Sequence, residues 1–213
     1  MSDLIGDFWA YPLSWGETLS SHDWVPLYIN RLLNSDFVAY ALAEGRRADI
    51  GTALLLWSES IKQDPAGTLP DDDVALARLA GFGTDIEGWR DAKRGALYGW
   101  SVCHIDGEHV SAGRDRAKRL GHPVIASICH DMYKRKRGRD QSREAGALAT
   151  LKSRVKAKLK AVGQVRASEN QYLVEQISGW LRDSSLYCTE DNVRAGLEAV
   201  AGIPKVVGMR GDS

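Results

Sequence analysis

The sequence predicts a mainly α-helical protein with a small β-hairpin, built from two parts. Apolar residues recur at three- and four-residue steps in several stretches, which is the spacing of helices with one buried face. One β-like run, near the middle of the chain, leads into an Asp-Gly turn signal of the kind that closes a hairpin. A basic stretch at 134–142 contains a glycine and no apolar residue, so we interpret it as the linker between the two parts.

Residues 67–82 predict a turn, a helix cap and a short helix. Pro70 cannot continue a preceding helix, and the three aspartates at 71–73 place carboxylates at the free N–H groups of the next helix. We interpret these aspartates as a cap and not as a magnesium site, because one helix N-terminus accounts for all three. Gly81 is expected to stop this helix, and a second helix is predicted over Thr84–Leu97. Two short helices joined by a glycine-containing turn are typical of a helix-turn-helix.

The segments on either side of this helix pair complete the predicted architecture. Upstream, a helical stripe is formed by Ile50, Leu54, Trp57 and Ile61. Downstream, a strand is predicted at 100–105, just before the turn signal. The order helix, helix, helix, hairpin is that of a winged helix-turn-helix.

These observations divide the chain into three regions. The winged helix is placed at residues 23–136, and its last helix is expected to begin near Val124. An aromatic arm at 1–22 precedes it and is expected to pack on the domain or on a partner. Residues 142–204 are predicted to form a C-terminal module of three helices, the first of which has an apolar side and a basic side.

Seven short segments between Asp23 and Lys136 resemble, in their order and spacing, the YdaU-like family of phage and prophage proteins. The segments are Trp24-Val25-Pro26, Leu56-Trp57, Leu69–Asp73, Leu76-Ala77-Arg78, Trp89-Arg90, Ala96–Trp100 and His122–Ile125. The resemblance covers about half of the chain. It implies a winged-helix fold and a role in phage replication or another DNA transaction, and it implies no catalytic residue.

The chain departs from that family pattern at Glu108–Gly121. Family members pass almost directly from the Asp-Gly turn to His-Pro, whereas this sequence has an intervening segment. We interpret the segment as an enlarged wing or a disordered loop. It adds positive charge where a wing would meet a duplex.

Positive charge is concentrated in one part of a chain whose formal net charge is zero. Lys134–Lys160 contains eleven basic and two acidic residues, a local excess of nine. Such a polarised chain can present a basic surface to a polyanion, and the alternative interpretation is an ordinary solvated surface. The predicted DNA-contacting residues are Arg90, Lys93, Arg94, Arg114, Arg116, Lys118, Arg119, Lys134, Arg135, Lys136, Arg137, Arg139, Lys152, Lys156 and Lys160.

The sequence offers no pattern for catalysis, for a metal or for a cofactor. It contains no glycine-rich phosphate loop, no Gly-x-Ser-x-Gly and no His-Glu-x-x-His, so no catalytic residue is assigned. His104, His109, His122 and His130 do not combine with the cysteines in a common zinc spacing. Trp89 and Trp100 are interpreted as core anchors and not as stacking platforms for bases.

Other features indicate a protein of the reducing cytoplasm. The three cysteines, Cys103, Cys129 and Cys188, are far apart and odd in number, and we expect buried reduced thiols. The N-terminus lacks the basic region of a signal peptide, and no apolar run approaches the ~20 residues that span a bilayer.

We therefore expect a non-enzymatic DNA-binding protein of phage or prophage origin, with duplex DNA favoured over single strands. The expected role is that of a replication accessory, in origin binding or helicase loading, or of a transcriptional regulator. The alternative is an interaction module that does not bind DNA. In that case the aromatic arm and the C-terminal helices bind a host or phage replication or transcription protein.

Overall fold

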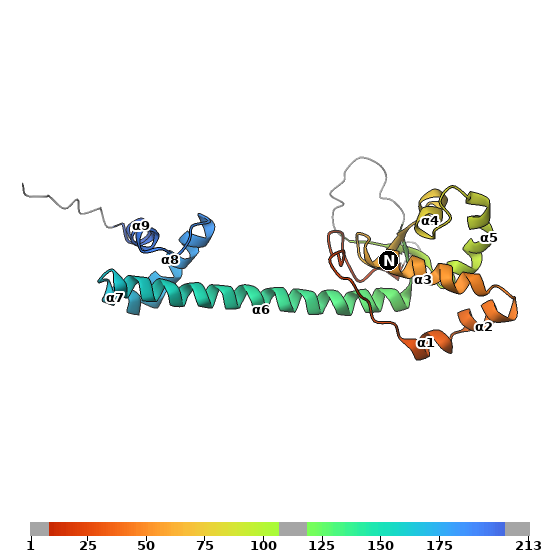
Figure 1. Ribbon diagram of the computed structural model, residues 1–213, viewed down its shortest axis with the longest axis horizontal. Coiled ribbons are helices and arrows are strands. Elements are labelled where there is room, and N and C mark those ends of the chain that lie inside the picture. The colour runs from red at the N-terminus through yellow and green to blue at the C-terminus, as the bar shows by residue number, and fades with distance from the viewer. Residues whose placement is uncertain (1–8, 107–118, 203–213) are drawn as a thin grey trace, which may run out of the picture. The chain divides into compact units, whose positions relative to one another are not determined.

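The computed structural model describes residues 9–106 and 119–202 of the chain (Figure 1). The described part is mainly helical and carries one small mixed sheet of four strands, in the order β1-β3-β4-β2. The chain divides into two compact units, residues 1–137 and 138–213, called unit 1 and unit 2 here. The division falls inside the stretch interpreted as a linker.

Nine helices and four strands make up the described part of the chain. The helices are α1 (Ile29–Leu33), α2 (Asp36–Ala43), α3 (Arg47–Ile61), α4 (Asp73–Leu79), α5 (Ile86–Ala96), α6 (Pro123–Ala161), α7 (Val165–Glu169), α8 (Gln171–Asp183) and α9 (Glu190–Ala201). The strands are β1 (Trp9–Ala10), β2 (Thr68–Pro70), β3 (Ser101–His104) and β4 (Arg119–Gly121). The predicted class, mainly α with a small β element, is confirmed, and the sheet is larger than the predicted hairpin.

Polar caps and a glycine stop define the helix pair α4 and α5. Asp72 Oδ1 accepts a hydrogen bond from Ala75 N at 2.8 Å and caps α4. Asp85 Oδ1 accepts one from Gly88 N at 2.9 Å and caps α5. Gly81 follows α4 with φ of +85°, a conformation that glycine adopts without strain. The predicted aspartate cap and glycine stop of α4 are thus confirmed.

The sheet joins the predicted hairpin to two strands that the sequence did not reveal. β3 and β4 pair antiparallel, with Val102 opposite Leu120, and residues 107–118 of their connection lie outside the described part. β2 pairs antiparallel with β4, which places Leu69 opposite Leu120. β1, from the N-terminal arm, pairs parallel with β3. The sheet therefore ties the arm and the segment before α4 to the hairpin strands.

One core of unit 1 lies beneath α4 and α5 and is centred on Trp89. This side chain is fully buried, at 0% exposure, among Leu56 of α3, Leu69 of β2 and Leu76 of α4. Trp100 is partly buried and packs against this core. The interpretation of Trp89 and Trp100 as core anchors is consistent with these positions.

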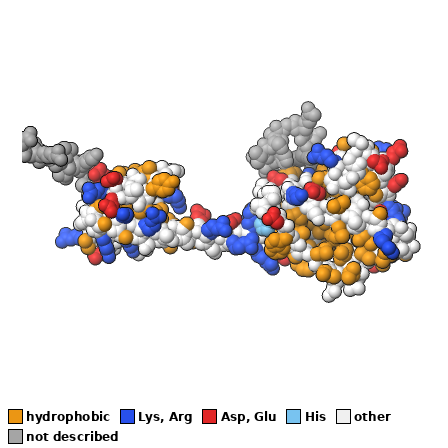
Figure 2. Space-filling model, viewed as in Figure 1, with side chains coloured by type: hydrophobic (Ala, Val, Ile, Leu, Met, Phe, Trp, Pro, Cys, Tyr) orange, Lys and Arg blue, Asp and Glu red, His pale blue; other side chains and the backbone are white. Residues whose placement is uncertain are grey.

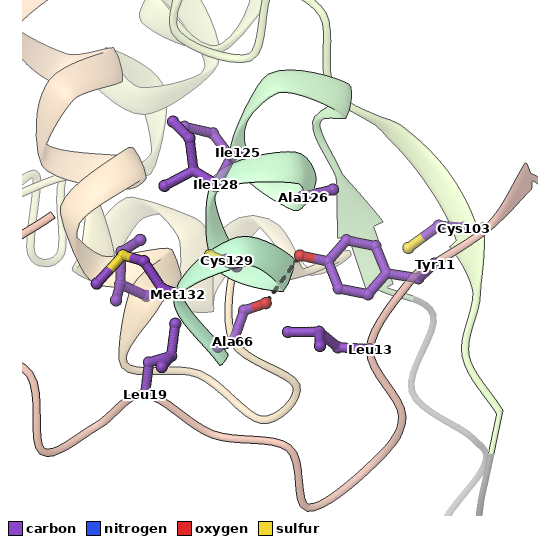
Figure 3. Close-up of a cluster of buried hydrophobic side chains, with 11 residues drawn as sticks. Tyr11, Leu13, Leu19, Ala66, Cys103, Ile125, Ala126, Ile128, Cys129 and Met132 are labelled. Atoms are coloured by element: carbon purple, nitrogen blue, oxygen red, sulfur yellow. Dashed lines mark hydrogen bonds between the residues drawn. The ribbon is translucent and has the colours of Figure 1, made fainter. Parts of the chain in front are cut away.

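A second core of unit 1 holds the N-terminal arm against the start of α6 (Figure 3). Tyr11 and Leu13 of the arm are buried there, and the Tyr11 hydroxyl donates a hydrogen bond to the carbonyl of Ala66 at 2.8 Å. The described part of the arm thus packs on its own domain, the first of the two places expected for it. The side chains that α6 contributes are Ile125, Ala126, Ile128, Cys129 and Met132.

The buried face of α3 is rotated from the predicted stripe. Ile61 of the predicted stripe is buried, at 5% exposure, whereas Ile50, Leu54 and Trp57 are only half-buried. Ala53 and Leu56, which lie outside the stripe, are buried at 1% and 0% exposure. Figure 1 shows the reason, since α4 and α5 lie on one side of α3 and α1 and α2 on the other. Two sides of α3 are therefore covered. The half-buried residues Ile50 and Trp57 lie on the side that faces α2, which is less tightly packed.

Helix α6 passes through the predicted linker without a break. Gly138 lies inside it, and a glycine in a helix interior is unfavourable by only about 1 kcal/mol relative to alanine. The Lys, Arg and Gln residues around it are good helix formers, and no proline occurs between Pro123 and Pro204. The stretch 134–142, interpreted as the linker, is therefore helical, and the division between the two units falls inside it. None of the described helices is long and apolar enough to cross a membrane.

Unit 2 consists of the C-terminal part of α6 together with α7, α8 and α9. Val155 and Leu159 of α6 pack with Ile177 and Leu181 of α8 and Val193 of α9, all at 0% exposure. The three predicted helices are present, and the short α7 is an addition.

Candidate nucleic-acid interface

Helix α5, the second helix of the predicted helix-turn-helix, presents two arginines to solvent. Arg90 and Arg94 are exposed and lie one turn apart, which places them on one helix face. Glu87 and Asp91 are exposed on the same face. This face therefore carries no net charge, and general attraction of a polyanion must come from elsewhere.

The third predicted cation of α5, Lys93, is held against α4. Asp73 Oδ1 accepts hydrogen bonds from Lys93 Nζ at 2.7 Å and from Trp89 Nε1 at 3.2 Å. The hydrogen bond from Lys93, then that from Trp89, lowers the pKa of the Asp73 carboxyl. Asp73 therefore joins the first turn of α4 to α5, and Lys93 is one of its two partners in α5.

A buried carboxylate of α3 lies where this helix meets α5. Asp49 is 6% exposed, and its Oδ2 accepts a hydrogen bond from Arg46 Nε at 2.7 Å. The same guanidinium donates from Nη2 to the carbonyl of Asp91 at 2.7 Å. The Asp49 carboxylate also lies so close to Gly95 that a Cβ at this position would collide with it. The packing of α5 on α3 thus depends on contacts that the sequence pattern did not indicate.

The inserted segment after the hairpin turn divides into two parts. Arg114, Arg116 and Lys118, three of the predicted DNA-contacting residues, lie outside the described residues. Arg119 is described and is 9% exposed. It was predicted as a DNA contact because it belongs to a run of basic residues, but a buried side chain is not presented to DNA.

The guanidinium of Arg119 binds groups inside unit 1. Its Nε and Nη2 donate to Thr68 Oγ1 at 3.0 and 2.9 Å, and Nη2 also donates to Gln63 Oε1 at 3.1 Å. Burial is the main cause that lowers its pKa. Arg119 therefore connects β4 to β2 and to the end of α3.

The basic run at the middle of α6 is exposed and helical (Figure 2). Lys134, Arg135, Arg137 and Arg139 are exposed, as predicted for residues that contact phosphates. Lys136 differs, because it is half-buried and its Nζ donates to the carbonyl of Thr18 at 3.0 Å. It therefore helps to fasten the arm to α6.

Helical structure in this run reveals one basic residue that the sequence interpretation missed. Arg143 is exposed and follows Arg135 and Arg139 at four-residue intervals. Residues at this spacing lie above one another on a helix, so the three guanidiniums form one ridge. The spacing is visible in the sequence, but it has no meaning in a segment interpreted as a linker.

The lysine ridge predicted in the C-terminal module is partly neutralised within unit 2. Lys152 Nζ is 2.6 Å from Glu175 Oε1 of α8, and this hydrogen bond lowers the pKa of the Glu175 carboxyl. Lys158, which was not part of the prediction, pairs in the same way with Glu190 at 2.9 Å. Lys156 and Lys160 are exposed. Two of the three predicted lysines therefore remain available to a phosphate.

Thiols and imidazoles show no arrangement for chemistry in residues 9–106 and 119–202. Cys103, Cys129 and Cys188 are free and buried, as predicted. Desolvation raises the pKa of Cys103 to about 11 and that of Cys129 to about 12, so neither is a ready nucleophile. No three His, Cys, Asp or Glu residues of this described part come together as metal ligands do.

The chain matches no protein-family model, no curated protein and no solved structure. The resemblance to the YdaU-like family therefore stays a prediction.

Proposed function

We propose that unit 1 is a winged-helix domain that binds duplex DNA, in a non-enzymatic protein of phage or prophage origin. The observation that carries this proposal is the order α3, β2, α4, α5, β3, β4, with β4 paired antiparallel to both β2 and β3. This is the order of a helix-turn-helix followed by a hairpin. In helix-turn-helix proteins the second helix lies in the major groove. Here that helix is α5.

The distribution of charge supports separate roles for two surfaces. The neutral exposed face of α5 suits contacts to particular base edges, which Arg90 and Arg94 can make. The exposed arginines of α6 suit contacts to phosphates, which provide affinity without sequence information. We expect the protein to act as a replication accessory, in origin binding or helicase loading, or as a transcriptional regulator.

Fluorescence anisotropy with labelled duplex and single-stranded DNA of one sequence tests this proposal. We expect tighter binding to the duplex and a steep loss of affinity between about 50 mM and about 200 mM salt. Arg90→Gln/Arg94→Gln should weaken binding and reduce discrimination between duplex sequences. The control Arg166→Gln/Arg182→Gln removes the same charge from exposed positions in unit 2. Equal binding by the wild type and the α5 variant would contradict the proposal.

A protein-interaction module is the second candidate, and exposed apolar side chains favour it. Trp24, Ile29 and Leu33 are 64%, 60% and 63% exposed, and α1 contains no buried residue. The described part of the arm is used in the core of unit 1, so a partner would meet this segment instead. Loss of self-association or of partner binding in Ile29→Glu/Leu33→Glu, with DNA binding unchanged, would identify that function.

A further inference from the structure

A cavity of about 550 Å³ lies in unit 1 beside the half-buried side of α3. Residues from the segment before α1, from α1, α2 and α3, from the turn after α5 and from the first turns of α6 converge on it. Its aromatic walls include Phe37, Trp57 and Tyr98, and Leu54 and Ile125 are among its aliphatic residues. Cavities of roughly 300–1,000 Å³ with apolar walls are typical of small-molecule sites.

The aromatic residues of the wall are packed against one another. The ring centroid of Phe37 lies 6.3 Å from that of Trp57 and 5.8 Å from that of Tyr98. The planes of the Phe37 and Tyr98 rings are stacked at an angle of 28°. Such a wall offers flat π-surfaces to a planar ligand. Figure 2 shows a broad hydrophobic area on this unit. Arg31 and Asp36 also line the cavity, and neither is ion-paired with any described residue.

His122 contributes a hydrogen-bond donor to the cavity wall. Its Nδ1 accepts a hydrogen bond from Val124 N at 3.2 Å, so the proton of the neutral ring resides on Nε2. No acceptor in the described part of the chain takes this proton. Desolvation lowers the pKa of His122 to about 4, so the ring is neutral near pH 7.

The position opposite this donor is kept small. A Cβ at Gly99 would lie 2.6 Å from His122 Nε2, and Gly99 also has φ of +79°. Any larger residue there would displace the imidazole. The rings of Trp57 and Trp100, with centroids 5.9 and 5.7 Å from the imidazole, complete its surroundings. The ring is therefore held in place with one donor unused.

We propose that this cavity binds a small planar aromatic molecule that carries a hydrogen-bond acceptor. The ligand's ring packs against the Phe37, Trp57 and Tyr98 side chains, and its acceptor, such as a carbonyl oxygen or a ring nitrogen, binds His122 Nε2. This is a binding activity separate from contact with DNA. A second protein chain fits less well, because the lining residues come from six segments that converge on one hollow.

Two matched probes and two matched variants test the proposal. The probes are methyl naphthyl ketone, which has an acceptor, and isopropylnaphthalene, which has the same shape without one. The variants are Ser58→Trp, which places an indole in the cavity from an exposed wall position, and Ala48→Trp, which adds the same group to an exposed position of α3 outside the cavity. Saturation-transfer NMR detects binding of each probe to the full chain, and titration of the protein with each probe gives the dissociation constant.

We expect the ketone to bind the wild type and Ala48→Trp about tenfold more tightly than the hydrocarbon, the usual effect of one added hydrogen bond. Ser58→Trp should bind neither probe while it retains the wild-type melting temperature. Equal binding of the ketone to all three proteins would overturn the cavity as the site. Equal binding of the two probes to the wild type would overturn the role of His122. Dimerisation that Ser58→Trp abolishes, without probe binding, would show that the cavity accepts a second copy of the chain.

Discussion

Helix α5 and the basic stretch of α6 at 134–143 are both candidates for contact with DNA, and they are positioned in opposite ways. α5 is fixed by the buried side chain of Trp89 and by Asp73 of α4, which accepts hydrogen bonds from Trp89 and Lys93. Arg46, paired with Asp49, also donates a hydrogen bond to the carbonyl of Asp91 in α5. In the α6 stretch, Lys136 alone donates a described hydrogen bond to another segment. The comparison shows that positioning and charge are supplied by different elements. α5 holds few cations in a defined geometry, and the α6 stretch holds many, of which Lys136 alone has a described tertiary hydrogen bond.

Loss of the Trp89 side chain should have the largest effect, because it removes the centre of the core beneath α5. Trp89→Ala is expected to reduce the free energy of unfolding by about 4 kcal/mol, the typical result for a large buried aromatic residue. Trp24→Ala, at a residue 64% exposed, is the control and should change stability by less than about 0.5 kcal/mol. Chemical unfolding measures both. Similar stability of the two variants would show that α5 does not depend on this core.

The start of α6, unlike its basic stretch, should make stability depend on pH. The pKa of His122 is lowered from 6.5 to about 4 by desolvation in the folded protein. As pH falls below 6.5 the unfolded chain binds a proton that the folded chain does not, so this stabilisation is complete above pH 6.5 and is lost on the way to about 4. The full difference is about 3 kcal/mol.

Urea unfolding of the wild type and of His122→Gln across this pH range isolates the effect, since glutamine does not titrate. The difference between their unfolding free energies should shrink as the pH falls. NMR titration of the His122 ring in the folded protein gives a direct check. An imidazole that titrates near its ordinary value would contradict the burial of this residue at the start of α6.

Removal of the arginine ridge of α6 should test whether this helix supplies contacts to phosphates. Arg135→Gln/Arg139→Gln/Arg143→Gln is expected to leave the melting temperature unchanged, because these side chains are exposed. If each arginine neutralises one phosphate, the salt dependence of duplex binding should fall by about 0.9 per contact in the slope of log affinity against log salt. Affinity should fall equally for all sequences. A sequence-dependent loss would assign base contacts to α6 instead of α5.

Much of the local structure could be predicted from the sequence, because local chemistry determines it. Asp72 is a helix cap by its position before an apolar run, and Gly81 stops that helix by its left-handed backbone. The helix expected to begin near Val124 is likewise present, as α6.

The rest depends on partners that are distant in the chain. β1 and β2 are too short to be recognised without β3 and β4 beside them. Arg119 looks like its basic neighbours until Thr68 and Gln63 accept its hydrogen bonds. Arg143 became part of the candidate site only because α6 continues through Gly138, in the segment that was interpreted as a linker. Candidate residues on helices with local caps were therefore predicted better than those whose burial is decided by the sheet.

The smallest effect is expected at Lys93, the α5 cation that already has a partner. Its Nζ is 2.7 Å from Asp73 Oδ1, and both side chains are partly exposed, so Lys93→Met should change stability by only about 0.5 kcal/mol. Because this charge is neutralised within the protein, the variant should also bind duplex DNA almost as well as the wild type, whereas Arg94→Met should bind more weakly. Asp73→Asn releases Lys93 and removes a negative charge, so it should strengthen binding. Anisotropy titrations of the three variants with duplex DNA at one salt concentration measure these affinities. A larger loss of affinity for Lys93→Met than for Arg94→Met would mean that Lys93 breaks its ion pair with Asp73 and contacts the DNA.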